Sequence, residues 1–312
     1  MRKALVIGCD GQDGHLLTKS LEKDGWGVVG VARKSLRGTI PSAPPVDICD
    51  AAAVAALVKE CRPDEIYHLA AVHHSSEHAP CDPLELFRDS YAIHVLSLVH
   101  FLDAMRRHAP SARLFYAASS HIFGLPPMPI QDETTPINPR NVYGVTKASG
   151  LFACRLYRCE HSLFVSAGIL YNHESPLRGP GFISRKIALG AAAAKRGSCE
   201  KLVLGNLSAE ADWGYAPDYV EAMRAILEQP RPDDFVVATG ERRTVRDFAA
   251  AAFSELGLDW RDHVVEDVGV LTKPHVPLVG DASKLRRTTG WRPRTDFPSM
   301  IRTLLQAETA AR

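Results

Sequence analysis

The feature that most constrains the fold is an alternation of short apolar segments with amphipathic helical segments along the first part of the chain. Apolar segments typical of buried strands cover residues 4–7, 27–31, 65–69 and 113–118. Helical patterns fill the intervals between them, at residues 15–23, 51–61 and 83–107. Strands that alternate with helices predict βαβ units, and right-handed crossovers give a doubly wound parallel sheet with helices on both faces.

The pattern becomes less regular after residue 170. We therefore predict an α/β protein with a Rossmann-type doubly wound parallel sheet and a smaller C-terminal substrate-binding lobe. The predicted dinucleotide-binding domain covers residues 1–170 and the lobe covers 171–312, with residues 212–240 returning to the sheet. Open sheets of this kind bind ligands outside the carboxyl ends of their strands, so we expect the lobe to close over that edge.

The composition narrows the class of partner and the compartment. The 312 residues carry a formal net charge of +1, so no charge excess points to nucleic acid or to a membrane surface. No apolar run has the length that a bilayer span requires. The seven cysteines have no metal-ligand spacing, and the first residues show no signal peptide. We expect a cytoplasmic protein with reduced thiols and no bound metal.

The first predicted strand leads directly into a glycine-rich turn. Glycines permit a tight turn whose backbone N–H groups approach a pyrophosphate at the positive end of the next helix. A strand before the turn and a helix after it strengthen this interpretation. The turn therefore predicts a dinucleotide site that contains Gly8, Gly11, Gln12, Asp13 and Gly14.

Residues that follow the other strands complete the predicted cofactor site. Arg33 and Lys34 follow the second strand, where an acidic residue would bind the ribose of NAD and cations favour the 2′-phosphate of NADP. We therefore expect NADP rather than NAD. Asp47 follows a third predicted strand in the sequence Val-Asp-Ile and is expected at the adenine edge. The end of the 65–69 strand is expected to line the same site with Leu69, Ala70 and Ala71.

Tyr143 and Lys147 are spaced so that both side chains lie on one face of a helix. A lysine ammonium lowers the pKa of a neighbouring tyrosine, so the phenol can exchange a proton with a substrate hydroxyl near neutral pH. The strand 113–118 ends at Ser119 and Ser120, whose hydroxyls we expect to face the tyrosine and the substrate. These residues predict a hydride-transfer site. In it Ser119 orients the substrate, Tyr143 is acid and base, and Lys147 tunes the tyrosine and holds the nicotinamide ribose.

Segments spread over nearly the whole chain resemble the GDP-mannose 4,6-dehydratase branch of the extended short-chain dehydrogenases. They include Gly-Gln-Asp-Gly at 11–14, Arg-Pro-Asp-Glu-Ile-Tyr at 62–67, Asp-Glu-Thr-Thr-Pro at 132–136, Asn-His-Glu-Ser-Pro at 172–176 and Asp-Trp-Gly at 212–214. The resemblance implies a GDP-linked sugar as substrate and implies that Asn172, Arg185 and Lys186 bind its diphosphate. It also implies that His73 lies beside the sugar and that Lys273 replaces a diphosphate-binding arginine.

The resemblance implies a reaction in three steps: C4 of the sugar is oxidised by NADP, water is eliminated across C5–C6, and the hydride returns to C6. In the family a glutamate two residues before an aromatic-glycine pair removes the C5 proton. Here the pair is Phe123-Gly124 and the position holds His121. Histidine can act as base and acid near neutral pH, so we predict a dehydratase with His121 in its site. The alternatives are a GDP-4-ketosugar reductase, a sugar 4-dehydrogenase or an epimerase, and a His121 that only fills space beside the sugar.

Other departures from the family concern the diphosphate and the assembly. Ala211 stands where the family has a further arginine. The loop at residues 35–45 is shorter than the family's loop, which pairs subunits around the cofactor. The family's tetramer is therefore not carried over, and we expect a homo-oligomer that is at least a dimer.

Overall fold

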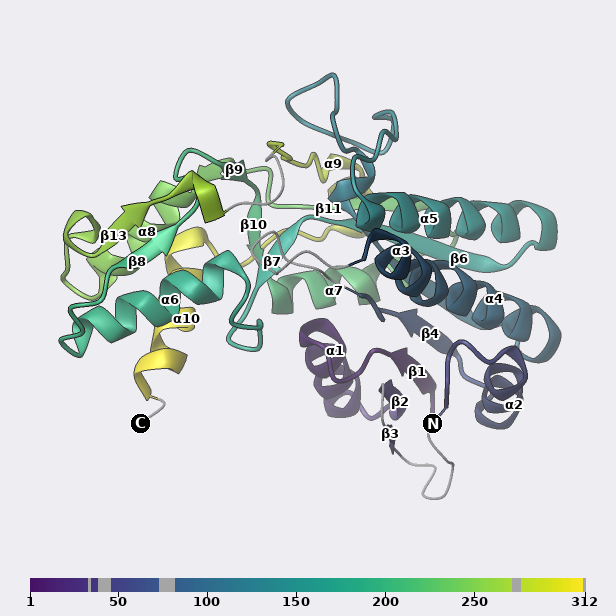
Figure 1. Cartoon of the computed structure of the whole chain (residues 1–312). Helices are drawn as coiled ribbons and strands as arrows, with labels where there is room; N and C mark the ends of the chain where they lie inside the picture. Colours follow the sequence, from purple (N-terminus) through teal and green to yellow (C-terminus); the bar gives the residue numbers. More distant parts are fainter. Residues whose placement is uncertain (33–34, 39–45, 73–81, 271–275, 311–312) are drawn as a thin grey trace.

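The computed structural model describes residues 1–32, 35–38, 46–72, 82–270 and 276–310. Its centre is a seven-stranded sheet in the order β11-β6-β5-β4-β1-β2-β3 (Figure 1). Six strands are parallel, and β3 at the edge is antiparallel to β2. The strands are β1 (Lys3–Ile7), β2 (Gly27–Ala32), β3 (Ser35–Gly38), β4 (Glu65–His68), β5 (Arg113–Ser119), β6 (Phe164–Leu170) and β11 (Asp234–Val237). The predicted doubly wound α/β fold is confirmed.

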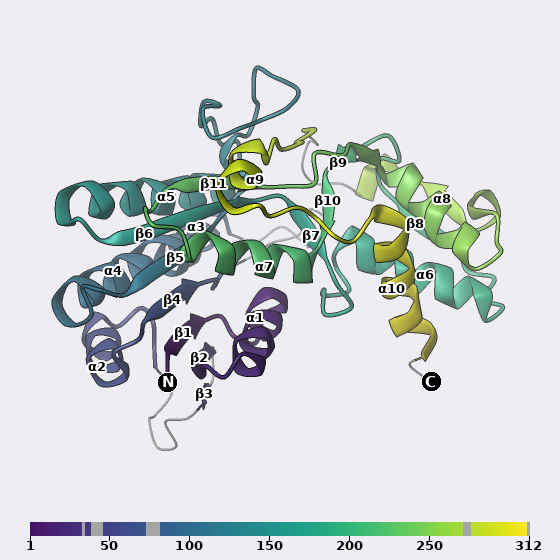
Figure 2. The same cartoon turned by 180° about the vertical axis from the view of Figure 1, so that it is seen from behind.

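Helices cover both faces of the sheet (Figures 1 and 2). One layer contains α1 (Gln12–Lys23) and α7 (Ala216–Leu227), which pack against each other, and α9 (Ser283–Thr289) packs on β11. The other layer contains α2 (Ala51–Cys61), α3 (Pro83–Tyr91), α4 (Ser97–His108) and α5 (Val142–His161). Apolar side chains such as Leu17 of α1 and Leu151 of α5 are fully buried beneath these layers, and this burial is the main force that holds the helices on the sheet.

The strand order places β1 beside β4 at the point where the winding direction changes. From β1 the chain continues to β2 on one side, while β4 is followed by β5, β6 and β11 on the other side. The two connections therefore leave a crevice outside the carboxyl ends of β1 and β4, which is where open α/β sheets bind ligands.

A smaller lobe lies beside the carboxyl edge of the sheet and carries the C-terminus (Figures 1 and 2). Three helices pack around its apolar core: α6 (Ile183–Lys195), α8 (Val245–Glu255) and α10 (Phe297–Ala310). Short strand pairs complete it: β7 (Asn172–Glu174) with β10 (Trp213–Tyr215), β9 (Glu210–Ala211) with β12 (Arg243–Thr244), and β8 (Leu202–Leu204) with β13 (Val264–Glu266). Since β11 belongs to the main sheet, the chain crosses from the sheet to the lobe and back.

Two predicted elements differ in the structure. The helix predicted over 83–107 is interrupted by a π-helical turn, Ala92–Leu96, which separates α3 from α4. The strand predicted around Asp47 is an irregular segment that leads into a turn. The carboxylate of Asp47 accepts from the N–H of Cys49 at 2.9 Å. Asp50 caps α2 by accepting from the N–H groups of Ala52 and Ala53. The bond from Cys49 uses a backbone donor that a strand would offer to its neighbour, and the Asp50 cap starts the following helix.

Three further findings concern the described residues alone. No helix among them combines the length and the apolar character that a membrane crossing requires. They contain no group of three or more histidine, cysteine or acidic side chains arranged to bind a metal ion. The cysteines at positions 9, 49, 61, 154, 159 and 199 are free thiols.

Candidate active site

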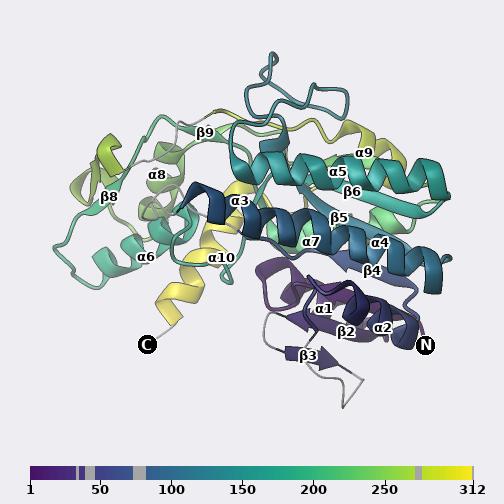
Figure 3. The same ribbon diagram turned by 45° about the vertical axis from the view of Figure 1, so that its right-hand side comes forward.

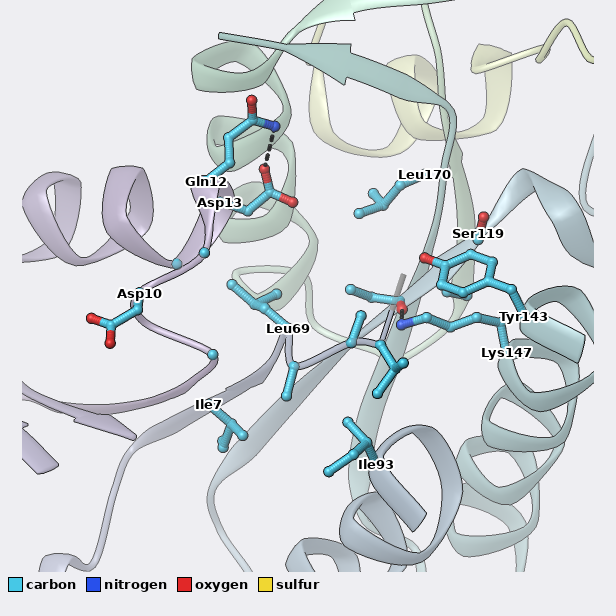
Figure 4. Close-up of a pocket in the computed structure, with 18 of the residues that line it drawn as sticks. Ile7, Asp10, Gln12, Asp13, Leu69, Ile93, Ser119, Tyr143, Lys147 and Leu170 are labelled. Carbon is cyan, nitrogen blue, oxygen red and sulfur yellow. Dashed lines mark hydrogen bonds between the residues drawn. The ribbon is translucent and has the colours of Figure 1, made fainter. Parts of the chain in front are cut away.

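A cavity of about 910 Å³ occupies the crevice between β1 and β4. Its walls come from the glycine turn, the ends of β4 and β5, the start of α5 and the segment that leads from β6 into the lobe (Figure 4). The predicted site residues that line it are Gly8, Gly11, Gln12, Asp13, Gly14, Asp47, Leu69, Ala70, Ala71, Ser119, Ser120, His121, Tyr143, Lys147 and Asn172. The fold thus brings the predicted cofactor turn and the predicted catalytic residues into one cavity.

Other predicted residues are not placed in this cavity. Arg33, His73 and Lys273 lie outside the described residues. Arg185 pairs with Glu308 of α10 at 2.8 Å and also donates to the carbonyl of Pro176. Neither Arg185 nor its neighbour Lys186 lines the cavity. Their assignment to the diphosphate stays a prediction.

The glycine turn brings the start of α1 against the end of β1. A Cβ atom on Gly14 would lie 2.2 Å from the carbonyl oxygen of Gly8, so only glycine permits this approach. The close packing aims the first turn of α1 at the cavity, and the partial positive charge of a helix N-terminus favours an anionic group there.

Tyr143 and Lys147 extend from α5 toward the end of β5, where Ser119 lies (Figure 4). The phenol of Tyr143 forms a hydrogen bond with Ser119. The Lys147 amine donates to the carbonyl of Ala117 at 2.7 Å and lies 5.7 Å from the centre of the Tyr143 ring. Lys147 is 1% exposed, so its position is fixed by the surrounding protein.

Burial dominates the proton equilibria of both residues. It lowers the pKa of the Lys147 amine to about 7, because the interior disfavours an ammonium. Burial raises the pKa of the Tyr143 phenol to about 12, against the opposing charge of Arg178 and the bond with Ser119. The charge that opposes burial of the phenol is that of Arg178. The role of Lys147 in lowering the phenol pKa stays a prediction.

His121 follows the end of β5 and packs edge-on against Tyr143, with ring centres 5.7 Å apart at 88°. Its backbone N–H donates to the hydroxyl of Ser119 at 3.3 Å. Its Nδ1 atom lies 3.2 Å from the side-chain nitrogen of Asn141, the residue that precedes α5. The histidine that replaces the family's glutamate is therefore beside the tyrosine and held by two neighbours.

The sequence interpretation gave no role to two polar residues of the cavity wall, His173 and Arg178. The Nε2 atom of His173 lies 2.9 Å from a carboxylate oxygen of Asp13. Arg178 pairs with Glu174 at 3.1 Å and lies over the ring of Phe182 at 3.8 Å. His173 is inside the segment at 172–176 that carries the resemblance, and Arg178 follows it closely. Both residues follow the end of a strand, and this position is the sequence signal that could have placed them in the cavity wall.

Asp13 and His173 form an ion pair between the glycine turn and β7. Burial alone would raise the pKa of Asp13, but the charge and hydrogen bond of His173 lower it overall. Burial alone would lower the pKa of His173, but Asp13 raises it overall. Each group thus stabilises the charged form of the other.

Comparison with known protein families identifies the family of this chain. Residues 5–304 match the family model described as GDP-mannose 4,6 dehydratase. The chain belongs to this family. It is 36% identical over 327 residues to GDP-mannose 4,6 dehydratase 2 of Arabidopsis thaliana, covering 98% of this chain and 86% of that protein. It is 34% identical to the GDP-mannose 4,6 dehydratase of Homo sapiens, covering 98% and 91%.

Solved structures agree on the fold. The structure of RMD from Pseudomonas aeruginosa complexed with NADPH superposes with a TM-score of 0.84 at 21% identity, covering 99% of each chain. A putative epimerase from Burkholderia cenocepacia has the same TM-score at 25% identity, with 99% of each chain covered. The shared fold thus spans the sheet and the lobe together.

Proposed function

We propose that this enzyme acts on a GDP-linked sugar by the family's three steps: oxidation at C4, loss of water across C5–C6 and return of the hydride to C6. The observation that carries the proposal is the single cavity, which holds a dinucleotide turn at one side and Ser119, Tyr143 and Lys147 at the other. Membership of the dehydratase family supports the choice of substrate and reaction.

The described residues of the cavity fit a nicotinamide dinucleotide. The Gly8–Gly14 contact keeps the turn tight and brings the start of α1 to the cavity, where its backbone N–H groups can approach a pyrophosphate. The ends of β4 and β5 offer small side chains, including Ala70, Ala71 and Ala117, along the path toward Tyr143. When bound, the nicotinamide supplies the hydride acceptor. We propose NADP, on the strength of Arg33 and Lys34 in the sequence.

The chain's own residues would manage the protons of the C4 hydroxyl. Ser119 holds Tyr143 by a hydrogen bond, and the phenol oxygen is the group in reach of a sugar hydroxyl. Since burial raises the phenol pKa to about 12, the site must gain positive charge or donors when ligands bind. Protonation of Lys147, whose pKa burial lowers to about 7, would supply that charge.

A reductase or 4-dehydrogenase is the second candidate function. It uses the same Ser119, Tyr143 and Lys147 without eliminating water. The specific observation in its favour is that position 121, where the family's glutamate would remove the C5 proton, holds a histidine.

Mass spectrometry of GDP-mannose incubated with the protein, with and without added NADP, separates these functions. A dehydratase yields a product lighter by one water and no net NADPH. Net NADPH with no loss of water would replace the proposal by a dehydrogenase. Unchanged GDP-mannose would reject this substrate, and a 4-keto sugar with NADPH would then test the reductase.

Tyr143→Phe checks the proposed machinery. The variant keeps the ring and loses the phenol oxygen, so we expect turnover to fall by at least about a hundredfold with nucleotide-sugar binding nearly intact. Tyr157→Phe, on the same helix and outside the cavity, is the matched control. Retained turnover in Tyr143→Phe would remove the assigned role.

We further infer a homo-oligomer in the cytoplasm. Exposed apolar side chains gather on α3 and α5, which lie on one face of the molecule (Figure 3): Leu84, Phe87, Tyr91, Phe152 and Leu156. The two helices contact each other, and exposed apolar side chains on adjacent helices are typical of protein interfaces. Free cysteine thiols support a reducing compartment. Light scattering of the purified chain tests the oligomer, and the mass of a monomer would contradict it. Fractionation of the source cells tests the compartment, and an exported protein would contradict the cytoplasmic location.

A further inference from the structure

Asn141 precedes α5 and joins the start of that helix to His121. Its side-chain oxygen accepts from the backbone N–H of Gly144 at 2.8 Å, which caps the helix. Its side-chain nitrogen lies 3.2 Å from the Nδ1 atom of His121. One amide group therefore serves both the helix that carries Tyr143 and the histidine that replaces the family's glutamate.

The cap fixes which way round the Asn141 amide lies. A backbone N–H can only donate, so the atom of Asn141 that faces Gly144 must be the carbonyl oxygen. The atom that faces His121 is then the NH₂ group, which can only donate. Nδ1 of His121 must accept this bond and cannot carry a proton. In neutral imidazole the proton is then on Nε2.

Neighbouring residues hold both Asn141 and His121 in these positions. A Cβ atom on Gly144 would lie 2.4 Å from the carbonyl oxygen of His121, so the glycine allows the helix to approach that backbone. The N–H of His121 is held by Ser119, and its ring packs against Tyr143. If Nδ1 of His121 carried a proton, its N–H would face the NH₂ group of Asn141, and both groups would be donors. Only a flip of the Asn141 amide would relieve this, and the flip would break the helix cap at Gly144.

We propose that Asn141 is a positioning residue that selects the Nε2–H form of His121, in which Nδ1 accepts from Asn141 and Nε2 carries the proton, so that neither nitrogen of the neutral ring can take the C5 proton. The inference rests on the proposed function, in which position 121 faces the sugar. The carboxylates among the described cavity residues are Asp10, Asp13 and Asp47, all on the cofactor side. We therefore expect C4 oxidation to be faster than removal of the C5 proton.

Imidazole ¹⁵N NMR of the full chain tests the tautomer without any substrate. We expect His121 to carry its proton on Nε2. In Asn141→Asp the carboxylate keeps the cap and also accepts from His121, so the proton should move to Nδ1. Asn206→Asp is the matched control, because Asn206 accepts from the N–H of Ser208 in the lobe. A proton on Nδ1 in the unaltered chain, or an unchanged tautomer in Asn141→Asp, would overturn the inference.

Activity supplies the second arm. In Asn141→Asp the neutral ring should carry its proton on Nδ1 and a lone pair on Nε2, so we expect the ratio of water loss to C4 oxidation to rise by at least about tenfold. His121→Glu supplies a carboxylate that can accept from Asn141 and should raise the ratio as well. A fall of the ratio in Asn141→Asp, with the tautomer shifted as expected, would contradict the inference that the tautomer of His121 limits removal of the C5 proton. No water loss from any variant, with the tautomers as expected, would reject the dehydratase function and leave the positioning role intact.

Discussion

At the residue scale, Lys147 is an amine held in the protein interior, and this has a consequence for stability. Below about pH 7 the amine is charged in both states, and the folded state carries the full cost of burying the charge. As the pH rises from about 7 to 10.5, the unfolded chain stays charged while the folded amine is neutral, so this cost disappears. We expect the thermal midpoint of Lys147→Met to exceed that of the unaltered protein at about pH 6, and the difference to disappear near pH 10.5. Turnover should be abolished.

Thermal unfolding of both proteins across this pH range measures the difference. Lys195→Met is the control, since Lys195 lies on α6 and donates to the carbonyl of Leu256 at the surface. An equal gain for Lys147→Met at both ends of the range would contradict the buried-cation account.

The residues whose place in the cavity could be predicted from the sequence are those positioned by local structure. The glycine turn and the spacing of Tyr143 and Lys147 are set within one strand-to-helix connection or one helix. The position of His173 against Asp13 depends on two segments 160 residues apart, which no local pattern contains. Arg185 has the charge that a diphosphate needs, but its partner Glu308 comes from the last helix. Charge alone could not show that this arginine was already paired.

At the element scale, the π-helical turn Ala92–Leu96 connects three parts of the site through His94. The ring accepts from the N–H of Val72, after β4, at 2.8 Å. Its other nitrogen lies 2.7 Å from the hydroxyl of Thr146, which itself donates to the carbonyl of Val142 in the first turn of α5. His94 is fully buried and meets the Tyr143 ring edge-on at 5.3 Å. The π-helical turn thus supports the wall of the cavity and the helix of the catalytic tyrosine.

We expect His94→Leu to destabilise the protein by about 2–4 kcal/mol, because it leaves the Val72 N–H and the Thr146 hydroxyl without this partner. Turnover should fall by about tenfold through displacement of Tyr143, since small misplacements cost catalysis heavily. His94→Gln, which can still accept and donate, should recover part of both losses. Denaturant unfolding and kcat are the measurements, with the exposed His161→Leu as control. A normal kcat in a folded His94→Leu protein would contradict the support role.

The sequence predicts elements best where side chains mark their ends. The helix predicted at 51–61 agrees with α2, and in the structure Asp50 caps its start by accepting from the N–H groups of Ala52 and Ala53. Apart from Pro83 at its first position, the predicted helix at 83–107 contains no proline or glycine, so no residue inside it indicates the π-helical turn. That turn is set by the buried contacts of His94, which the fold creates.

At the scale of the whole molecule, the pair of Asp13 and His173 ties the glycine turn to the strand that enters the lobe. Both nitrogens of His173 face acceptors: Nε2 faces Asp13 at 2.9 Å and Nδ1 faces the carbonyl of Tyr171 at 2.6 Å. This arrangement suits the doubly protonated ring, whereas the partners of His94 and His121 include donors and suit neutral rings. Gln12 adds a bond from the hydroxyl of Ser175 at 2.8 Å.

The pair contributes stability in a limited pH window. The pKa of His173 is raised above 6.5, so its contribution is fully present below pH 6.5 and is lost as the pH rises through the raised value. The pKa of Asp13 is lowered below 3.8, so its contribution is present above pH 3.8 and is lost as the pH falls through the lowered value. The connection between turn and lobe should therefore be strongest in mildly acidic solution and weaken in alkali.

We expect His173→Leu to destabilise the protein by about 3 kcal/mol at about pH 5.5, because the Asp13 carboxylate stays behind without its counter-charge. The loss should shrink in alkali, where the unaltered His173 is neutral as well. Asp13→Asn in the same background should recover part of the loss, because an amide needs no counter-charge. Chemical unfolding of the two single variants and the double variant, at both pH values, gives the coupling energy directly. A coupling that is zero, or equal at both pH values, would show that the ion pair does not hold the turn to the lobe.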